Sequence, residues 1–125
     1  MNLNYSQATG IITDDDGHVI VPMGKAWAGR DKGKNNPDMQ GVRETGPLPQ
    51  GVYTVGDWGT HGHLGPDSAQ LIQTKGDTFG RSGFYIHGPA MYGNYGQESK
   101  GCIVILRLFR LKVEEMKPDT ITVKA

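Results

Sequence analysis

Phe84-Tyr85-Ile86-His87-Gly88 and Ser99-Lys100-Gly101-Cys102-Ile103-Val104-Ile105 are the two segments that decide the fold of this chain. Both read as short strands of β-branched and aromatic residues, and each carries a chemically reactive side chain near one end. If the strands are neighbours in one sheet, the connection through residues 88–101 brings Cys102 back beside His87. The connection costs little, because loop-closure entropy grows slowly with length and its glycines allow sharp turns. We therefore predict that Cys102 and His87 share one site.

The length and charge of the chain indicate one folded domain, residues 1–125. A chain of 125 residues buries roughly two thirds of the surface that its unfolded state exposes, so it can fold without disulfides or structural metal ions. Thirteen basic and thirteen acidic residues cancel, and no stripe of Lys and Arg forms a footprint for nucleic acid or anionic lipid. No apolar run approaches the length of a membrane span. We expect neither nucleic-acid binding nor membrane insertion.

Glycine and proline divide most of the chain into short strands and turns. Nineteen glycines and seven prolines leave no helix-length segment before residue 100, which predicts a mainly β fold. One helix is expected near the C-terminus, where apolar residues recur at helical spacing with Arg107, Arg110, Lys112 and Glu115 between them, before Pro118. The expected strands are Thr9–Thr13, His18–Val21, Gly24–Ala28, Val52–Val55, Leu71–Thr74, Phe84–His87, Cys102–Ile105 and Thr120–Lys124.

A thiol and an imidazole in this arrangement indicate nucleophilic catalysis. Cysteine reacts as the thiolate, and His87 can act as the general base that removes the proton from Cys102. The backbone carbonyl of Gly88 can hold the imidazole in one tautomer. The amides of Gly101 and Cys102 can stabilise a tetrahedral oxyanion. Acyl transfer of this kind needs neither a cofactor nor a metal ion.

Aromatic and cationic residues close to the two strands are candidates for substrate binding. An arginine fork such as Arg81 can hold a carboxylate, and tyrosine rings can line a groove. We expect Arg81, Tyr85 and Tyr92 to contact substrate, together with the neighbouring Tyr95. The competing interpretation is that they are surface and core residues without a role.

Zinc chemistry is an alternative. His61-Gly62-His63 can direct two imidazoles to the same side of an extended segment. A zinc-dependent peptidase would then need a third ligand, for which the candidates are His18, His87 and Asp67. A His-x-His motif in a glycine-rich loop is weak support for such a site without a second motif elsewhere.

A structural role for the cysteine is the other alternative. Free cysteine is among the most buried residue types, so Cys102 can be a small apolar side chain in the core. The protein is then a non-catalytic binding module whose glycine-rich loops grip a ligand. A mechanism through Cys102 depends on a base within hydrogen-bond reach, which the sequence suggests but does not place.

The ordered motifs of the chain resemble the YkuD-type L,D-transpeptidases, in which a histidine followed by a small residue precedes a Ser-x-Gly-Cys segment. More closely, they resemble the L,D-transpeptidase-like effectors of the type VI secretion system. This resemblance implies a YkuD-like β-sandwich with a cleft built on the sheet. The matching segments are Gly29, Lys34-Asn35-Asn36-Pro37, Gly46-Pro47-Leu48-Pro49-Gln50-Gly51-Val52-Tyr53, Phe79-Gly80-Arg81-Ser82-Gly83-Phe84-Tyr85-Ile86-His87-Gly88 and Ser99-Lys100-Gly101-Cys102-Ile103.

The resemblance implies roles and a substrate. Cys102 is then the nucleophile, His87 its general base, and Ser99 and Gly101 shape the pocket and the oxyanion site. The family acts on the stem peptide of peptidoglycan: the thiolate attacks the carbonyl of the L-centre of a diamino acid, expels D-alanine and leaves a thioester. Water then gives L,D-carboxypeptidase activity, a D-amino acid gives exchange, and an amino group of another stem gives a cross-link. In the non-catalytic alternative, the module only binds peptidoglycan.

Lys100 departs from the pattern of the housekeeping L,D-transpeptidases, which usually have histidine between the serine and the glycine. A lysine there repels the ammonium group of an incoming acceptor and favours an anionic donor. Trimming and exchange are therefore expected before cross-linking. Lys100 is a candidate substrate-binding residue, although it can equally be solvated.

The start of the chain predicts how the protein is delivered. Met1–Ile20 has three consecutive aspartates and no basic start followed by an apolar core, so it does not read as a signal peptide. With the resemblance, this predicts a protein made in the cytoplasm and secreted into the periplasm of a target bacterium as an antibacterial toxin. An immunity protein would be its partner. A cytosolic or phage-borne cell-wall enzyme, or a chain without its leader, would share these features.

Overall fold

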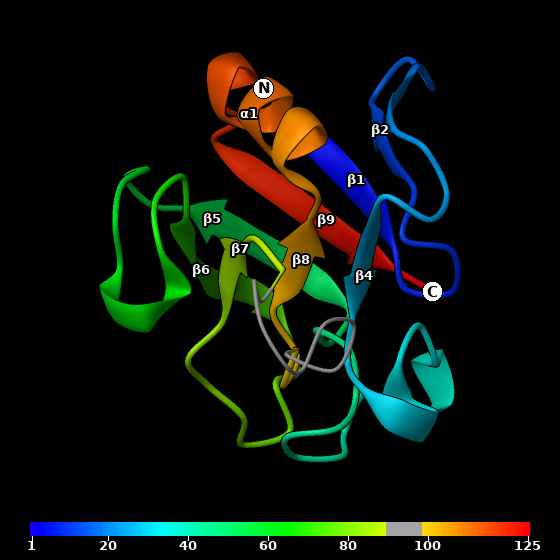
Figure 1. Cartoon of the computed structure of the whole chain (residues 1–125). Helices are drawn as coiled ribbons and strands as arrows, with labels where there is room; N and C mark the ends of the chain where they lie inside the picture. The colour runs from blue at the N-terminus through cyan, green and yellow to red at the C-terminus, as the bar shows by residue number, and fades with distance from the viewer. Residues whose placement is uncertain (90–98) are drawn as a thin grey trace.

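The computed structural model describes residues 1–89 and 99–125 (Figure 1). In these residues the domain consists of nine strands, one α-helix and three short 3-10 helices. The helix α1 (Arg107–Met116) lies between the last two strands in the chain, and the 3-10 helices cover Asp31–Gly33, Pro37–Met39 and Gly62–Leu64. The strands are β1 (Asn2–Ser6), β2 (Ile12–Asp14), β3 (Val19–Val21), β4 (Ala26–Ala28), β5 (Gly51–Val55), β6 (Ala69–Gly76), β7 (Tyr85–His87), β8 (Ile103–Ile105) and β9 (Thr120–Lys124).

The described strands form one continuous sheet in the order β3-β2-β1-β9-β5-β6-β7-β8-β4. β9 pairs in parallel with β1 and antiparallel with β5, so the first and last strands of the chain are neighbours. β6 connects the two halves of the sheet, because it pairs with β5 on one side and with β7 on the other. In Figure 1 the half that contains β7, β8 and β4 crosses in front of β5 and β9.

Apolar side chains from both halves of the sheet share one core. Tyr53 on β5 and Ile121 on β9 are fully buried, as are Ile86 on β7 and Ile103 on β8. The edge of one aromatic ring meets the face of another where Tyr53 contacts Phe84, with ring centroids 6.2 Å apart. This burial supplies the main favourable contribution to folding, and it fixes the position of β7 and β8 relative to the rest of the sheet.

The pairing of β7 with β8 positions the residues that the sequence singled out. The two strands are parallel, with Ile86 opposite Ile103 and His87 opposite Val104. Successive side chains of a strand point to opposite faces, and Ile86 and Ile103 point into the core. His87 and Cys102, each one residue away from these isoleucines, therefore lie on the same face of the strand pair.

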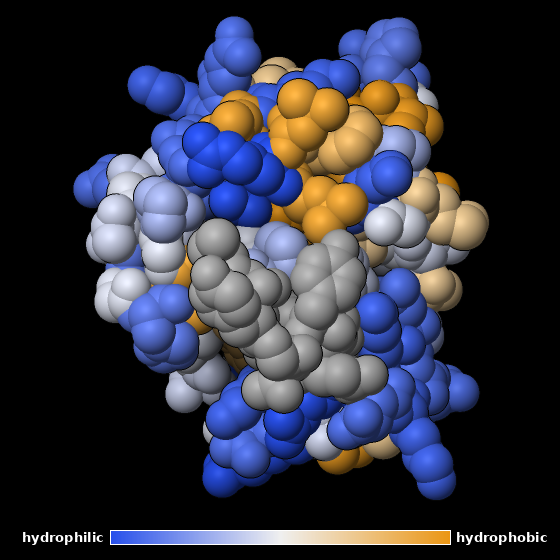
Figure 2. Space-filling view, viewed as in Figure 1, coloured by the Kyte–Doolittle hydropathy of each residue, from blue (hydrophilic) through white to orange (hydrophobic). Residues whose placement is uncertain are grey.

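The surface shown in Figure 2 is mostly hydrophilic, with apolar side chains gathered over the region of α1. Leu108 and Leu111 on this helix are exposed, whereas Val113 is fully buried against the sheet. No helix in residues 1–89 or 99–125 is long and apolar enough to cross a membrane.

The mainly β fold with one helix near the C-terminus, which the sequence predicted, is confirmed for the described residues. Two short 3-10 helices, Asp31–Gly33 and Pro37–Met39, lie in the polar segment that follows β4. β1 was not predicted, because Asn2 and Asn4 are poor strand formers. Tertiary contacts of its side chains stabilise this strand: Leu3 and Tyr5 are buried, and the Asn2 carboxamide oxygen accepts hydrogen bonds from Thr120 and Thr122.

Candidate active site

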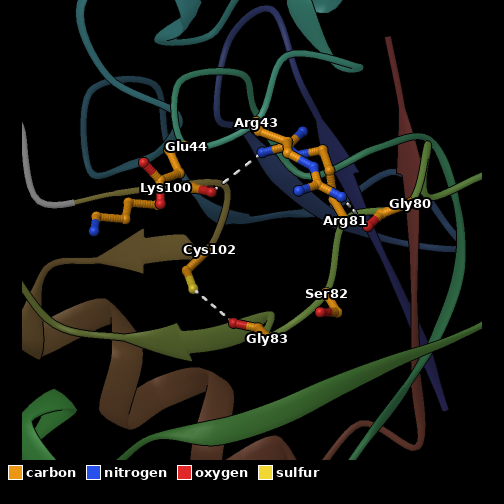
Figure 3. A pocket seen from close by; sticks show the side chains of 8 residues that line it. All are labelled: Arg43, Glu44, Gly80, Arg81, Ser82, Gly83, Lys100 and Cys102. Carbon is orange, nitrogen blue, oxygen red and sulfur yellow. Dashed lines mark hydrogen bonds between the residues drawn. The ribbon is translucent and has the colours of Figure 1, made fainter.

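A hollow of about 360 Å³ opens beside the only cysteine of the chain (Figure 3). Two loops and the turn before β8 contribute its walls. Cys102 is only 9% exposed, so its thiol lies at the floor of the hollow. A nucleophile recessed between loops can be shielded from water while a substrate segment occupies the space above it. The lining residues are Arg43, Glu44, Gly80, Arg81, Ser82, Gly83, Lys100 and Cys102.

The start of β7 holds the thiol. Cys102 Sγ accepts a hydrogen bond from the backbone N–H of Tyr85 at 3.3 Å. The thiol donates to the carbonyl oxygen of Gly83 at 3.7 Å. The parallel register explains these contacts, because it places Cys102 next to Tyr85 and close to the residues just before β7. The Tyr85 N–H can continue to donate when the sulfur becomes a thiolate, and such a bond favours the charged form.

The protonation state of Cys102 is set mainly by its burial. Burial raises the pKa of the thiol above its ordinary value, because a buried thiolate loses hydration. The N–H of Tyr85 and the positive charge of Arg81 lower the pKa, but they do not offset the burial. The protonated thiol is therefore the favoured form at neutral pH. Attack on a substrate requires a base that removes the proton as the bond forms.

His87 is held in a defined tautomer. Its Nδ1 lies 2.8 Å from the carbonyl oxygen of Gly88, and the side chain is buried. A carbonyl oxygen can only accept, so Nδ1 carries a proton, and when the ring is neutral its lone pair is on Nε2. The hydrogen bond from His87 to Gly88 is the one that the sequence suggested. An imidazole in this state, on the same face as Cys102, has the form that a general base requires.

Ser99 organises the turn that precedes the cysteine. Its hydroxyl donates to the carbonyl oxygen of Cys102 at 2.6 Å and accepts from the backbone N–H of Gly29 at 2.9 Å and of Gly101 at 3.2 Å. The turn is thereby closed on itself and tied to the loop after β4. The Gly101 amide is committed to Ser99 rather than to the oxyanion position that the sequence suggested for it.

Gly101 leaves room for a buried arginine. Its φ of 122° lies in a region that favours glycine. A Cβ at this position would lie 2.5 Å from Nη2 of Arg81 and 3.0 Å from the ring of Phe84. No other residue fits between these groups without displacing one of them.

Arg81 connects the loops of the hollow. It is only 6% exposed, and its Nη1 donates to the carbonyl oxygens of Gln40 and of Pro47, the latter at 2.8 Å. Its Nη2 donates to Gly46 at 2.9 Å and to Lys100 at 3.1 Å. The protein's own carbonyls engage both terminal nitrogens, so Arg81 fixes the shape of the hollow. That Arg81 also grips a substrate carboxylate stays a prediction.

The other residues expected to contact substrate differ in position. Lys100 is exposed at the rim of the hollow. Tyr85 is half-buried, and its ring packs against His61 with centroids 5.4 Å apart. Tyr92 and Tyr95 lie outside the described residues. Arg43 and Glu44 also line the hollow, and nothing in the sequence pattern marks them, because they belong to a loop without a motif.

The zinc site considered for His61 and His63 is not assembled in the described residues. Neither histidine belongs to a described group of three side chains close enough to share a metal ion. Asp14, Asp16 and His18 form the only such group in residues 1–89 and 99–125, on the exposed β2–β3 hairpin. The strand order places that hairpin at one end of the sheet and β7 near the other, so His18 belongs to a different region from His87.

The fold is that of the L,D-transpeptidases. The structure of the LD transpeptidase LdtMt1 in complex with imipenem superposes with a TM-score of 0.57 at 15% identity, over 98% of this chain and 58% of that chain. An L,D-transpeptidase from Mycobacterium smegmatis superposes with a TM-score of 0.52 at 18% identity, over 99% of this chain and 58% of that chain. This chain thus spans less than two thirds of either protein, and at these identities the likeness concerns the fold.

The family follows from the sequence. The family model of the Tlde1 domain matches residues 23–116, a range that includes both strands of the site. The chain therefore belongs to the Tlde1 domain family, the L,D-transpeptidase-like type VI effectors, and the sequence resemblance to that group is confirmed. A search of curated proteins found no match.

Replacing Arg81 by lysine should destabilise the domain. Lysine cannot reproduce the planar fork, so several buried carbonyls lose their donor, and we expect the free energy of unfolding to fall by about 2 kcal/mol or more. Urea denaturation of Arg81→Lys measures this. Arg43→Lys, at an exposed position on the same hollow, is the control and should change the value by less than about 0.5 kcal/mol. Equal stability of the two variants would show that the hydrogen bonds of the Arg81 guanidinium do not stabilise the domain.

The alkylation of Cys102 should depend on pH in the direction set by its burial. Only the thiolate reacts with iodoacetamide, and the raised pKa shifts thiolate formation to higher pH. The alkylation rate should therefore be low at neutral pH and reach half its maximum above the value of about 8.5 that is ordinary for cysteine. Intact-mass spectrometry follows the reaction without ambiguity, because the chain has one cysteine. A midpoint below that of a cysteine-containing control peptide would contradict the role of burial.

Proposed function

We propose that this domain is a cysteine-dependent acyl-transfer enzyme that acts on peptidoglycan stem peptides. It removes the terminal D-alanine as an L,D-carboxypeptidase, or exchanges it as an L,D-transpeptidase. The observation that carries the proposal is the position of the Cys102 thiol, at the floor of a hollow and on the same face of β7–β8 as an imidazole with a fixed tautomer. Membership of the Tlde1 family and the L,D-transpeptidase fold support peptidoglycan as the substrate.

The first half of the proposed reaction forms a thioester. Nε2 of His87 takes the thiol proton as Sγ of Cys102 bonds to the carbonyl carbon of the L-centre of the diamino acid. The tetrahedral intermediate collapses by breaking the bond to the nitrogen of D-alanine. The imidazolium returns its proton to that nitrogen, so D-alanine leaves as a neutral amine. The backbone N–H of Cys102 remains our candidate donor to the oxyanion, since the amide of Gly101 serves Ser99.

The second half releases the stem peptide. Water attacks the thioester while His87 takes its proton, and the bond to sulfur breaks to give the tripeptide carboxylate and the thiol. The amino group of a D-amino acid can take the place of water, which restores an amide bond and gives exchange. No cofactor or metal ion enters either half. The hydrogen bond from His87 Nδ1 to Gly88 is kept throughout, so the ring presents the same nitrogen in each proton transfer.

The charges at the rim of the hollow favour an anionic donor. Arg43 and Lys100 are exposed there, and Glu44, next to Arg43, is the acidic residue of the lining. A stem peptide carries carboxylates, so it is attracted to this rim, whereas the ammonium group of an acceptor stem is repelled. Hydrolysis and exchange are therefore proposed ahead of cross-linking. As a Tlde1 effector, the protein is proposed to be an antibacterial toxin that acts in the periplasm of a target bacterium, with an immunity protein as its partner.

The proposed reaction predicts defined products. Disaccharide-tetrapeptide incubated with the wild-type protein should yield the tripeptide, and added D-methionine should yield the D-methionine-exchanged tetrapeptide. Cys102→Ala should form neither product, because it lacks the nucleophile, and His87→Ala should lose at least about 100-fold of the rate. Mass spectrometry of the reaction mixture detects both products.

Two controls accompany this measurement. Circular dichroism must show that both variants keep the fold, and a chelator must leave the wild-type rate unchanged. Turnover by folded Cys102→Ala would refute the mechanism. Loss of activity with the chelator would support the zinc-dependent peptidase instead. Absence of product with the wild-type protein would favour the non-catalytic peptidoglycan-binding module.

The cations of the rim should affect substrate binding more than the chemical step. Arg43→Gln and Lys100→Gln should each raise KM for the tetrapeptide by about 2- to 5-fold with little change in kcat, because exposed charge pairs are weak. High salt should reduce the difference between these variants and the wild type. Lys112→Gln, on an exposed position of α1, is the matched control. A KM that does not respond to either rim variant or to salt would exclude this electrostatic contribution.

A further inference from the structure

Arg110 is a buried charge at a position that the sequence pattern assigned to the polar face of the helix. It lies on α1, is 6% exposed and points inward with Val113. Its Nε has no hydrogen-bond partner among the described residues, which costs free energy at a buried site. Apolar residues of similar volume are often neutral or stabilising in place of a buried charge. Stability alone therefore does not account for an arginine here.

The guanidinium of Arg110 touches the ends of both strands that carry the site. Nη1 donates to the carbonyl oxygen of Ile105, the last residue of β8, at 2.8 Å. The group also lies against Gly88, the residue after β7: a Cβ added to Gly88 would be 2.3 Å from Nη1 and 2.7 Å from Cζ. Gly88 is not among the glycines with positive φ. A side chain at Gly88 would therefore displace the neighbouring guanidinium, whereas the backbone conformation does not itself call for glycine.

Gly88 links this arginine to the imidazole. Its carbonyl oxygen accepts the proton of His87 Nδ1. The direction of that carbonyl follows the orientation of the peptide group, and a guanidinium packed against Gly88 limits how far the peptide group can rotate. Arg110 can thus influence the orientation of the His87 imidazole through Gly88.

Charged groups near α1 act on the guanidinium. Burial lowers the pKa of Arg110 and the positive charge of Arg107 adds to this effect, whereas the charges of Asp67 and Glu114 act in the opposite direction. Arginine nonetheless stays charged in proteins. Arg107, one turn earlier on α1, lies at the exposed end of this group with Nη1 3.8 Å from Oδ2 of Asp67. The buried cation is therefore attracted to carboxylates on one side and packed against the β7–β8 ends on the other.

We propose that Arg110 is a positioning residue for the general base. By packing against Gly88 and bonding to Ile105, it keeps the Gly88 carbonyl directed at Nδ1 of His87, so that Nε2 is the nitrogen that carries the lone pair of the neutral ring. The catalytic consequence rests on the function proposed above, whereas the effect on the imidazole tautomer does not.

The test compares Arg110→Met with the wild-type protein in two measurements. Imidazole nitrogen shifts in NMR spectra should show the Nδ1–H form of His87 in the wild type and a mixture of tautomers in Arg110→Met. Turnover of the tetrapeptide should fall in kcat by about 10- to 100-fold, with KM changed by less than about 2-fold, because substrate contacts are preserved. Arg110→Lys retains a charge and a donor for Ile105, and it should recover part of both effects.

Arg107→Met is the matched control, since it removes an exposed arginine from the same helix. It should leave the tautomer and kcat unchanged. If folded Arg110→Met keeps the wild-type tautomer and kcat, or if Arg107→Met changes them equally, the proposal is wrong. If the wild-type protein does not act on stem peptides at all, the proposed function fails, while the NMR measurement still decides the positioning of His87.

A second variant covers the case in which Arg110→Met does not fold. Gly88→Ala keeps the arginine but places a methyl group where the guanidinium lies. It should alter the His87 tautomer and reduce kcat to a similar extent. In combination with Arg110→Ala, which removes the obstructing group, Gly88→Ala should cause little further loss. Independent, multiplicative losses in the two variants would overturn the proposal.

Discussion

The parallel pairing of β7 with β8 is the constraint on which the site depends. Parallel strands cannot be joined by a tight turn, so the chain must leave the end of β7 and return to the start of β8. The return brings Cys102 next to Tyr85 and puts His87 diagonally across the same face. A register shift of one residue would turn either side chain into the core. Buried Ile86 and Ile103 prevent that shift, because they would lose their apolar environment.

Two polar groups then fix the turn that carries the thiol. Ser99 closes the turn from within, and Arg81 ties it to a loop more than thirty residues earlier in the chain. Both are buried and surrounded by hydrogen-bond partners, so each would be costly to remove. Gly101 is required because a side chain would occupy the place of the Arg81 guanidinium. The strands thus place the site, and these groups give it its shape.

The burial that shapes the site also determines how its chemistry must proceed. A recessed thiol is protected from reagents in bulk solvent, but its raised pKa keeps it protonated. The proposed enzyme therefore depends on proton transfer to an oriented imidazole during attack, rather than on a thiolate formed in advance. In the proposed mechanism, the orientation of this imidazole depends on the peptide group of Gly88 and on Arg110, which packs against Gly88. The backbone carbonyl of Gly88 takes, in this mechanism, the place that a carboxylate side chain has in many catalytic triads.

Composition and motif order determined the mainly β fold and the position of the helix, because strand alternation and helical spacing are local properties of a sequence. Short motifs also marked Cys102, His87, Ser99 and Gly101 as candidate site residues. The roles of the arginines were decided only by the tertiary structure. Arg81 and Arg110 both occupy positions that a sequence pattern assigns to solvent or substrate, yet both are buried against backbone carbonyls. Whether a guanidinium meets substrate, water or the protein itself depends on which distant loops converge on it. That convergence follows from the packing of the two halves of the sheet, about which a local pattern contains no information.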